Sequence, residues 1–487
     1  MKSRTIQLGL GATSVASVTL ALLAAGTPAN ASDRTPRLGF TPITSSALSC
    51  SAGGLIQFAN NSSNAAVTPT VLLRAGDAAS PVNAPATSTK VGRENDMIAL
   101  SPDGTYLFTS SENANPSDTG APNGSDGITR LTLKGKDAGK KEILADAVDT
   151  TGANIWQRVD GMKWYPTSRR DEDKGVLLAS EEYAAGGIWQ VDPRTGAFAR
   201  LDWLGSFSHE GIGLDRAGNL YLGDEARGGA LYKAVPNDRS DLTKGGTLFY
   251  LVGTGTDVTG WKAVVNPAGA SAEASSGGAV LFDRPEDFDE HNGRIYFTVT
   301  EPAGDALPRT GAAGQVVNQG GVYGLSASGV PGLAVQSGSL PYTRLTPMIG
   351  VNDPTYTSQA QAVAQQGLQF PDNLAFDGAG HLWVHEDIPD SDGSFPASGI
   401  DVGKQTRNQQ DELYVYVLNE KGDAIRPNPN VTGPGVSGGY KAADMRTSPA
   451  ATPCQNEFTG GIFAADGRTL YINQQHAENA TETIRLH

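Results

Sequence analysis

The sequence predicts an all-β protein, a β-propeller of about six blades with irregular loop insertions. Glycine and proline are abundant, at 60 and 28 residues, and they are the two residues least compatible with the interior of a helix. A short phrase also recurs five times, and each copy places alternating apolar residues after a tight turn, as hairpins do. Hairpins repeated along a chain are typical of radial β architecture, in which each repeat is a small sheet.

Each copy of the phrase contains a turn glycine, a short apolar alternation and a polar or acidic end. The copies span 101–112, 215–225, 290–301, 377–387 and 465–476, with turn glycines at 104, 218, 293, 380 and 467. The segments 174–183 and 187–201 predict a further unit of the same kind. Segments 60–90, 262–278 and 303–320 are rich in Ala, Ser, Gly and Pro and are predicted loops, whereas 358–366 is the helix-like stretch. A two-sheet sandwich is the alternative fold, but the chain is too long for a single one.

The first residues have the pattern of a targeting segment. Lys2 and Arg4 precede an apolar stretch, and residues 29–31 form a small-x-small cleavage pattern. We therefore expect a signal peptide over 1–31 and a single propeller domain over 32–487. No later apolar run approaches the roughly 20 residues that span a bilayer. The expected product is exported to the periplasm or the extracellular space, has no membrane span and is a monomer.

The charge balance indicates the class of partner. Asp and Glu number 52 against 37 Lys and Arg, a formal net charge of −15. Binding to nucleic acid requires a basic surface, so we expect no nucleic-acid partner. An acidic surface suits a protein that binds cations. Cys50 and Cys454 are the two cysteines, and export permits a disulfide between them, with two unrelated thiols as the alternative.

Acidic and amide residues gather where the predicted strands end. In a propeller, matching strand ends converge on the axis, where a ring of carboxylates repels itself unless cations neutralise it. Hard cations such as Ca²⁺ take six to eight oxygen ligands. The pattern therefore predicts an axial metal site, although any one of these acids could be a solvated turn residue. The positions are 111–113, 181–182, 209–210, 224–225, 284–287, 301, 386–387 and 474–476.

A nucleophilic serine is not indicated. Residues 435–439 match G-x-S-x-G, but that motif requires a preceding strand and a following helix, and neither is predicted there. His209, beside Glu210, is more typical of a structural hydrogen-bonding residue than of a ligand.

Several short blocks, in order, resemble the PhoX-type alkaline phosphatase family of exported bacterial proteins. The resemblance implies a six-bladed propeller whose axial site holds calcium ions and a pair of irons and releases phosphate from monoesters. The blocks cover 94–96, 177–182, 204–211, 223–225, 283–287, 371–377, 457–460, 466–470 and 475–476.

Carried over residue by residue, the resemblance implies roles for seven positions. Arg284, in the Arg-Pro-Glu-Asp block, would hold the substrate phosphate beside the catalytic Glu286. A guanidinium suits this role because it makes paired, charge-assisted hydrogen bonds to phosphate oxygens. The implied metal ligands are Glu181, Glu210, Glu225, Glu286, Asp372 and Glu457.

One position departs from the family pattern. The family has Thr-Cys-Glu-Glu, with the thiolate bridging the irons, whereas this chain reads Ala179-Ser180-Glu181-Glu182. Calcium requires only oxygen ligands, so the expected cofactor is Ca²⁺, and Ser180 argues against the iron that the resemblance also implies. The expected function is a metal-dependent phosphatase acting on small phosphate esters. Two alternatives remain: a calcium-binding propeller without catalysis, and a calcium-dependent hydrolase of lactones or phosphotriesters.

Overall fold

The computed structural model describes residues 57–58, 69–82, 89–92, 94–112, 127–146, 156–254, 257–300, 311, 315, 317–318, 321–325, 331–336, 371–387, 412–418, 424–425, 440–444, 456–476 and 480–486. All of them lie in one compact unit, Arg37–His487. The predicted signal peptide, Cys50, Cys454, Glu301 and the helix-like stretch 358–366 lie outside the described residues. No helix in the described part of the chain is long and apolar enough to cross a bilayer.

Six hydrogen-bonded sheets form the blades, each numbered here by the position of its innermost strand along the chain. Blade 1 contains β4 (Asn95–Leu100), β5 (Tyr106–Ser111), β6 (Gly127–Thr132), β7 (Lys141–Asp146) and β3 (Ser80–Pro81). Blade 2 contains β8 (Val159–Pro166), β9 (Gly175–Glu181), β10 (Ile188–Val191) and β11 (Phe198–Arg200). Blade 3 contains β12 (Ile212–Leu214), β13 (Leu220–Gly223), β14 (Arg227–Pro236), β15 (Gly246–Thr254), β16 (Asp257–Ala263), β17 (Leu281–Asp283) and β20 (Val317–Asn318).

The remaining three blades come from the second half of the chain. Blade 4 contains β18 (Pro285–His291), β19 (Arg294–Val299), β21 (Gly321–Leu325) and β22 (Pro331–Gln336). Blade 5 contains β23 (Pro371–Phe376), β24 (Leu382–Glu386), β25 (Glu412–Leu418), β26 (Ala424–Ile425), β27 (Tyr440–Asp444) and β1 (Gln57–Phe58). Blade 6 contains β28 (Asn456–Phe463), β29 (Thr469–His476), β30 (Ala480–Arg485) and β2 (Thr70–Arg74).

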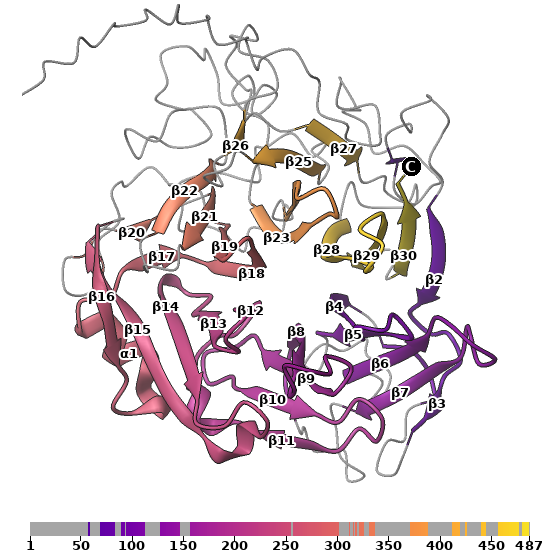
Figure 1. Cartoon of the computed structure of the whole chain (residues 1–487), viewed down its shortest axis with the longest axis horizontal. Coiled ribbons are helices and arrows are strands. Elements are labelled where there is room, and N and C mark those ends of the chain that lie inside the picture. The colour runs from indigo at the N-terminus through magenta and orange to yellow at the C-terminus, as the bar shows by residue number, and fades with distance from the viewer. Residues whose placement is uncertain are drawn as a thin grey trace, which may run out of the picture. The chain divides into compact units, whose positions relative to one another are not determined.

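The innermost strands close a ring around the axis (Figure 1). Strands β4, β8, β12, β18, β23 and β28 contact one another in that order, and β28 returns to β4. Strand β2 completes blade 6 by pairing antiparallel with β30, so an early segment of the chain joins the last described strand. The predicted all-β propeller is confirmed.

The repeated phrase is the hairpin that follows an innermost strand. Its five glycines all adopt positive φ, from 64° to 89°, the left-handed backbone that glycine adopts without steric cost. Each hairpin joins the first strand of a blade to the second in blades 1, 3, 4, 5 and 6. Blade 2 uses the different connection 167–174, as expected for the unit predicted without the phrase.

All three predicted loop segments contain some regular structure, since 303–320 includes β20. Segment 262–278 includes the 3₁₀ turn η3 (Pro267–Gly269) and the helix α1 (Ala270–Ser276), so the loop prediction was wrong there. Ala270 and Ala274 are four residues apart and both buried, a spacing that places them on one face of the short helix. Segment 60–90 likewise contributes β2 and β3. The other 3₁₀ turns are η1 (Asp202–Leu204) and η2 (Leu242–Lys244).

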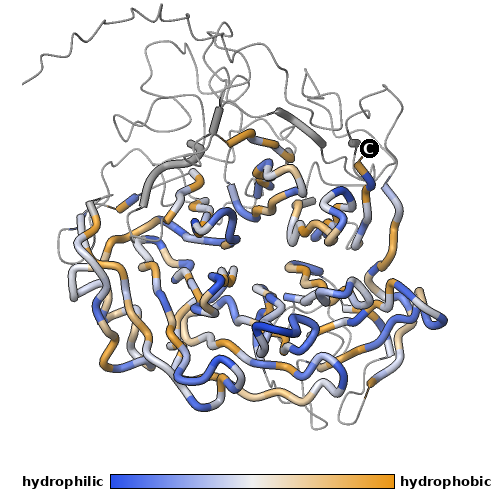
Figure 2. The backbone as a smooth tube through the Cα atoms, viewed as in Figure 1, coloured by the Kyte–Doolittle hydropathy of each residue, from blue (hydrophilic) through white to orange (hydrophobic). Residues whose placement is uncertain are grey.

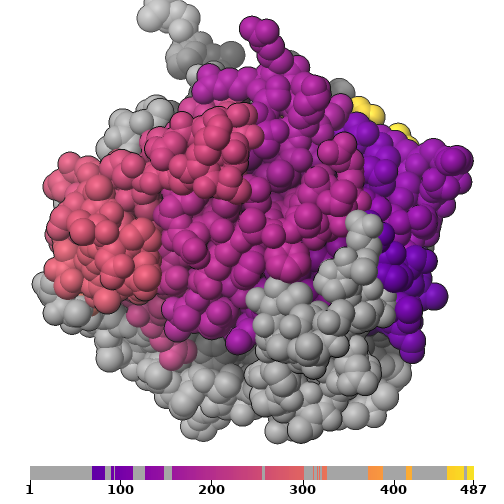
Figure 3. Space-filling view, turned by 90° about the horizontal axis from the view of Figure 1, so that it is seen from below, coloured from indigo at the N-terminus to yellow at the C-terminus, as the bar shows by residue number. Residues whose placement is uncertain are grey.

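Apolar side chains fill the spaces between neighbouring blades, and Figure 2 shows hydrophobic residues along the strands around the ring. One cluster, which includes Phe108 and Leu177, joins blades 1 and 2. Another, which includes Tyr165 and Tyr232, joins blades 2 and 3, and similar clusters continue around the ring. Figure 3 shows the outer side of blades 1 to 3 as a continuous packed surface. Each apolar face is thus buried against the next blade, which holds the inner strands in place around the axis.

Bulges interrupt four of the inner strands at matching positions. The pairing register shifts between the first and fourth residues of β4, β8, β18 and β23. A bulge inserts a residue and turns the neighbouring side chains in a new direction, and bulges are common beside active sites. These bulges decide which side chains face the axis.

Candidate metal centre at the propeller axis

Five inner strands each present a buried carboxylate at the same place. In each strand, the carboxylate lies two residues before a buried apolar residue, and regular strand pairing begins at that apolar residue. Asp160 lies before Met162 in this way, and Glu286 lies before Phe288. Gly460 takes this place in blade 6, where even a Cβ atom would overlap the backbone carbonyl of Asp96. We call these five carboxylates the inner ring: Asp96, Asp160, Glu210, Glu286 and Asp372.

A second layer of carboxylates comes from the residues that follow the second strands. Glu112 follows β5, Glu182 follows β9 and Glu225 lies two residues after β13. From blade 6, the Gln475 amide donates to Asp96 Oδ2 at 3.0 Å and to Glu112 Oε2 at 2.6 Å. The second strands therefore bring their terminal acids to the same end of the axis as the inner ring, as the sequence predicted.

The two layers combine into two compact groups. Glu112, Asp160 and Glu182 form group A, in which one oxygen from each residue lies within 4.8 Å of the others. Glu210, Glu225 and Glu286 form group B by the same measure. A side-chain hydrogen bond between Glu182 and Glu225 links the two groups.

The electrostatics of both groups favour neutralisation. Burial, reinforced by neighbouring carboxylates, raises the pKa of Asp160, Glu182 and Glu210 well above the usual range. Burial also raises the pKa of Glu286 to about 7, although Arg284 opposes the shift. Burial alone would raise the pKa of Glu225 too, but Arg284, the Glu182 hydrogen bond and Arg158 together hold the pKa below its ordinary value. So many buried acids ionise together only if cations compensate them.

The donors fit a hard cation. All six side chains of groups A and B offer carboxylate oxygens, which Ca²⁺ prefers. Asp160 Oδ1 is buried and has no hydrogen-bond partner among the described residues, so it retains an unused acceptor inside group A. The carboxylates of groups A and B could therefore hold calcium.

Two arginines face the groups. Arg284 Nη2 lies 2.8 Å from Glu225 Oε1, and its Nε lies 3.3 Å from Glu286 Oε1. Arg158 pairs with both Glu112 and Glu182. Both arginines have positive φ, 59° for Arg284 and 45° for Arg158. Non-glycine residues adopt this conformation at a cost of about 1–3 kcal/mol, and such residues cluster at functional sites.

The structure brings most of the predicted site residues together. Glu210, Glu225, Glu286 and Arg284 meet in group B, and Asp372 belongs to the inner ring. The carboxylate of Glu181 instead accepts hydrogen bonds from the backbone N–H groups of Gln157 and Gly187, at 2.9 and 3.0 Å.

Glu457, the remaining predicted ligand, is the second residue of β28 and pairs with Gln475; its side chain lies outside the described residues. The strand-end pattern included Glu112 and Glu182, which the seven carried-over positions did not; neither set included Asp96, Arg158 or Asp160. The available signal was the shared arrangement of an arginine followed two residues later by an acid, at 158–160 and at 284–286.

Ser180 has a hydrogen-bonding role in blade 2. Its buried hydroxyl donates to the backbone carbonyl of Glu210 at 2.6 Å. The hydroxyl thus links blade 2 to the backbone just before β12, the innermost strand of blade 3, and we call this its bracing role. A bridging thiolate at this position, as in the Thr-Cys-Glu-Glu pattern, has no counterpart here.

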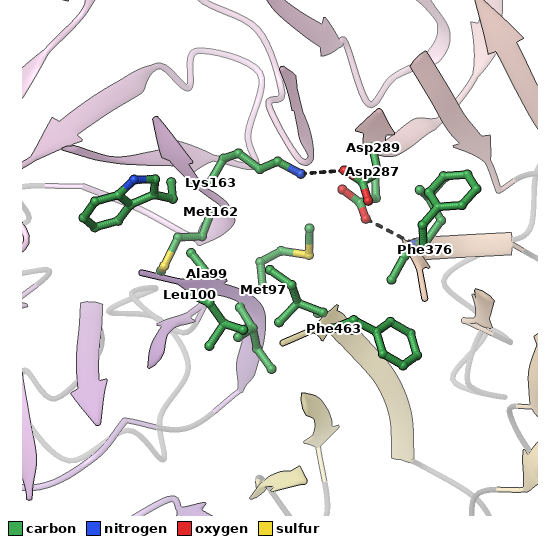
Figure 4. Close-up of a pocket in the computed structure, with 16 residues that line it drawn as sticks. Met97, Ala99, Leu100, Met162, Lys163, Asp287, Asp289, Phe376 and Phe463 are labelled. Atoms are coloured by element: carbon green, nitrogen blue, oxygen red, sulfur yellow. Dashed lines mark hydrogen bonds and ion pairs between the residues drawn. The ribbon is translucent and has the colours of Figure 1, made fainter. Parts of the chain in front are cut away.

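A separate cavity of about 160 Å³ lies where the inner strands continue beyond the inner ring (Figure 4). Apolar side chains such as Met97 and Met162 line it, together with an ion pair between Lys163 Nζ and Asp289 Oδ1 at 3.1 Å. Asp287 Oδ2 accepts a hydrogen bond from the Leu374 N–H at 3.1 Å. The ion pair joins blades 2 and 4 and the Asp287 hydrogen bond joins blades 4 and 5, and these polar groups belong to neither carboxylate group.

The fold and the axial cluster define a β-propeller with an all-carboxylate site suited to hard cations. The chain belongs to the alkaline phosphatase PhoX family, whose model matches residues 180–478. No curated protein sequence matches the chain.

Several solved structures are similar to the chain at low sequence identity. Pseudomonas fluorescens PhoX, in complex with vanadate as a transition-state analogue, is 17% identical with a TM-score of 0.57, covering 92% of this chain and 98% of that one. A Bacteroides thetaiotaomicron protein of unknown function is 10% identical, with a TM-score of 0.41 and coverage of 86% and 75%. The Xanthomonas campestris gluconolactonase XC5397 is 11% identical, with a TM-score of 0.40 and coverage of 90% and 99%. The similarity to PhoX supports the propeller fold.

Proposed function

We propose that this protein is an exported, calcium-dependent phosphatase that hydrolyses phosphate monoesters at the axial carboxylate cluster. The observation that carries the proposal is the pairing of Arg284 with Glu225 and Glu286 at the edge of group B. An anion-binding guanidinium beside a cation-binding group is the combination that phosphoryl transfer requires. Membership of the PhoX family supports the same conclusion.

The residues have complementary roles in this proposal. Bound calcium would neutralise charge on the reacting phosphate and orient an attacking water molecule beside it. The planar guanidinium of Arg284 binds two phosphate oxygens through charge-assisted hydrogen bonds. Glu225 and Glu286 contact Arg284 and fix its direction. The buried carboxylates of the inner ring, which include Glu286, would hold the cations in place, so catalysis depends on positioning and electrostatics.

Calcium is the proposed cofactor. Every donor in groups A and B is an oxygen, and the Ser180 hydroxyl is already bonded to Glu210. The donor set at residue 180 therefore does not fit a thiolate-bridged iron pair, and no step is assigned to iron.

The test measures phosphate release from p-nitrophenyl phosphate by protein purified with Ca²⁺. We expect turnover that EDTA abolishes and added Ca²⁺ restores. Glu210→Gln removes a group B charge and should lower both activity and calcium content. Glu172→Gln is the matched control, because Glu172 lies in the exposed blade 2 hairpin. Absence of turnover across pH and metal conditions would exclude the phosphatase proposal.

A calcium-binding propeller without catalysis is the second candidate, favoured by the hydrogen-bonded Ser180 in place of cysteine. It predicts calcium in the purified protein without phosphate release. A lactone and a phosphotriester in the same substrate panel test the hydrolase alternative.

Export and the monomeric state complete the proposal. Cleavage near residue 31 is checked by the N-terminal sequence of the secreted protein. Light scattering coupled to gel filtration checks the mass.

A further inference from the structure

We infer that Arg158 is a second oxyanion-binding residue, which captures the phosphate of the substrate from solvent and holds it opposite Arg284. The inference rests on the proposed function and adds a residue that neither the family pattern nor the predicted site contains. Four observations carry it: the equivalent backbone position of the two arginines, their matching ion pairs, their different exposure and the electrostatic link between their groups.

The two arginines occupy equivalent positions in two blades. Arg158 immediately precedes β8, and Arg284 immediately precedes β18. Both have left-handed backbone conformations, and each lies two residues before an inner-ring carboxylate, Asp160 or Glu286. Strained backbone persists where the surrounding structure imposes it, and it is frequent in ligand clamps. Glu94 has the same backbone conformation before β4, so the conformation belongs to the start of the inner strands, and in blades 2 and 4 the residue that adopts it is an arginine paired with the axial carboxylates.

Their ion pairs match as well. Arg158 bridges Glu112 and Glu182, two members of group A. Arg284 bridges Glu225 and Glu286, two members of group B. Burial lowers the pKa of Arg158, but Glu112 and Glu182, and less strongly Glu225 of group B, raise it. Because Glu182 and Glu225 share a hydrogen bond, the two arginine-carboxylate units adjoin each other.

Exposure distinguishes the two roles. The Arg158 side chain is 46% exposed, whereas that of Arg284 is 18% exposed. An incoming anion therefore meets Arg158 first. A solvent-accessible cation at the entrance of an acidic site offsets the repulsion that the carboxylates exert on a phosphate.

Cation binding would also change what Arg158 contacts. Glu112 and Glu182 belong to a group that can hold a cation, and a bound cation competes with Arg158 for their oxygens. Some N–H groups of the Arg158 guanidinium then become available to the phosphate, whose oxygens can accept two parallel hydrogen bonds from them. Calcium and phosphate should therefore strengthen each other's binding, and the coupling must be reciprocal.

The experiment compares wild type with Arg158→Gln, Arg158→Lys and Arg216→Gln. Arg216 is a matched control because it pairs with Glu290 across blades 3 and 4, at the hairpin end of the inner strands. Calorimetry measures the Kd of inorganic phosphate with and without Ca²⁺. Steady-state kinetics measures kcat and KM, and mass spectrometry measures the calcium content of each variant.

We expect Arg158→Gln to weaken phosphate binding in Ca²⁺ about tenfold, in line with the loss of a hydrogen bond to a charged group. KM should rise by a similar factor, with a smaller change in kcat and with bound calcium retained. Arg158→Lys should recover part of the loss because it keeps the charge without the fork. Arg216→Gln should match wild type.

Two results would overturn the inference. One is an unchanged phosphate Kd and KM in Arg158→Gln; the other is loss of calcium that accounts for the whole effect, which would make Arg158 a structural residue. Failure of the proposed function gives a different pattern: wild type turns over no ester, yet it binds phosphate with calcium- and Arg158-dependent affinity. If wild type binds no phosphate at all, both proposals are wrong.

Discussion

The hydroxyl of Ser180 donates a 2.6 Å hydrogen bond to the backbone carbonyl of Glu210, and both residues are buried. The bond runs from the end of β9 in blade 2 to the residue that contributes the blade 3 carboxylate of the inner ring. The residue at position 180 thus positions a carboxylate that is proposed to hold calcium.

Replacement of Ser180 tests this bracing role. Ser180→Ala removes the donor and leaves a buried carbonyl without it, so the free energy of unfolding should fall by about 1–3 kcal/mol. Urea denaturation of the calcium-loaded protein measures the change. Ser110 donates to the Asp160 carbonyl at 2.7 Å, so Ser110→Ala is the matched substitution and should have a similar cost. A negligible change in the Ser180 variant would contradict the bracing role.

Gly161 sets the spacing between blades 2 and 3. A methyl group at this residue would overlap the Glu210 carbonyl oxygen and the Ser180 hydroxyl, so the backbone would have to separate. Gly161→Ala should lower the free energy of unfolding by about 3 kcal/mol, at the upper end of overpacking costs, and should weaken calcium binding. Gly135→Ala is a control at an exposed turn with open space around it, although its φ of 84° adds some strain. Equal effects in the two variants would be the contrary outcome.

When calcium is chelated, the buried carboxylates should make the free energy of unfolding fall as pH rises. Burial raises the pKa of Glu286 from 4.5 to about 7, so the folded state binds more protons than the unfolded state between those values. The free energy of unfolding should therefore fall as pH rises from about 4.5 to about 7. The raised pKa values of Asp160 and Glu210 act in the same direction.

Thermal unfolding in EDTA and in Ca²⁺ measures this dependence. Tm in EDTA should drop across that interval, and the stabilisation by Ca²⁺ should grow with pH as cations replace protons. A Tm in EDTA that rises with pH would contradict the prediction.

Arg284 carries the catalytic part of the proposal. Arg284→Gln removes a group that stabilises charge on the reacting phosphate, and the loss of one such group costs about 10²–10³ in kcat. Arg284→Lys should recover only part of the rate because a lysine lacks the planar fork. Assays with p-nitrophenyl phosphate, with calcium content measured in parallel, check this. A normal kcat in Arg284→Gln would exclude the assigned role.

Leu73 tests the closure of the ring. It is fully buried in β2, the strand that pairs with β30 in blade 6. Leu73→Ala should lower the free energy of unfolding by about 2–5 kcal/mol, as measured by urea denaturation. Val71, a partly exposed residue of the same strand, is the control, and Val71→Ala should cost less. Equal costs would show that β2 contributes little to closure.

The sequence was sufficient to predict the blades but only part of the site. Turn glycines such as Gly218 and Gly380 predict hairpins by local chemistry alone. Acids that follow the second strand of a hairpin, such as Glu225, can then be placed at the axial end of that strand. Asp96 and Asp160 were not predicted as ligands because each is a single acid within a short strand. Only the bulge, a feature of pairing between strands, turns them toward the axis.

Glu181 and Glu182 show a second limit. Adjacent residues on a strand point to opposite sides, so at most one of them would be expected to face the cluster, and the register decides which. The structure directs Glu181 to backbone amides and Glu182 to group A. The apolar alternation of β9 does not extend far enough to settle that choice from the sequence.

The hydrogen bond between Gln475 of blade 6 and Glu112 of blade 1 also determines when the complete site can exist. Group A draws Glu112 from blade 1, and the Gln475 amide that bonds it comes from blade 6, so the polar shell of the cluster spans almost the full length of the described chain. During synthesis, an incomplete chain can form separate blades but cannot assemble this shell. Chains that stop before β29 keep the six carboxylates of groups A and B but lack the Gln475 amide, so they should bind calcium more weakly than finished molecules.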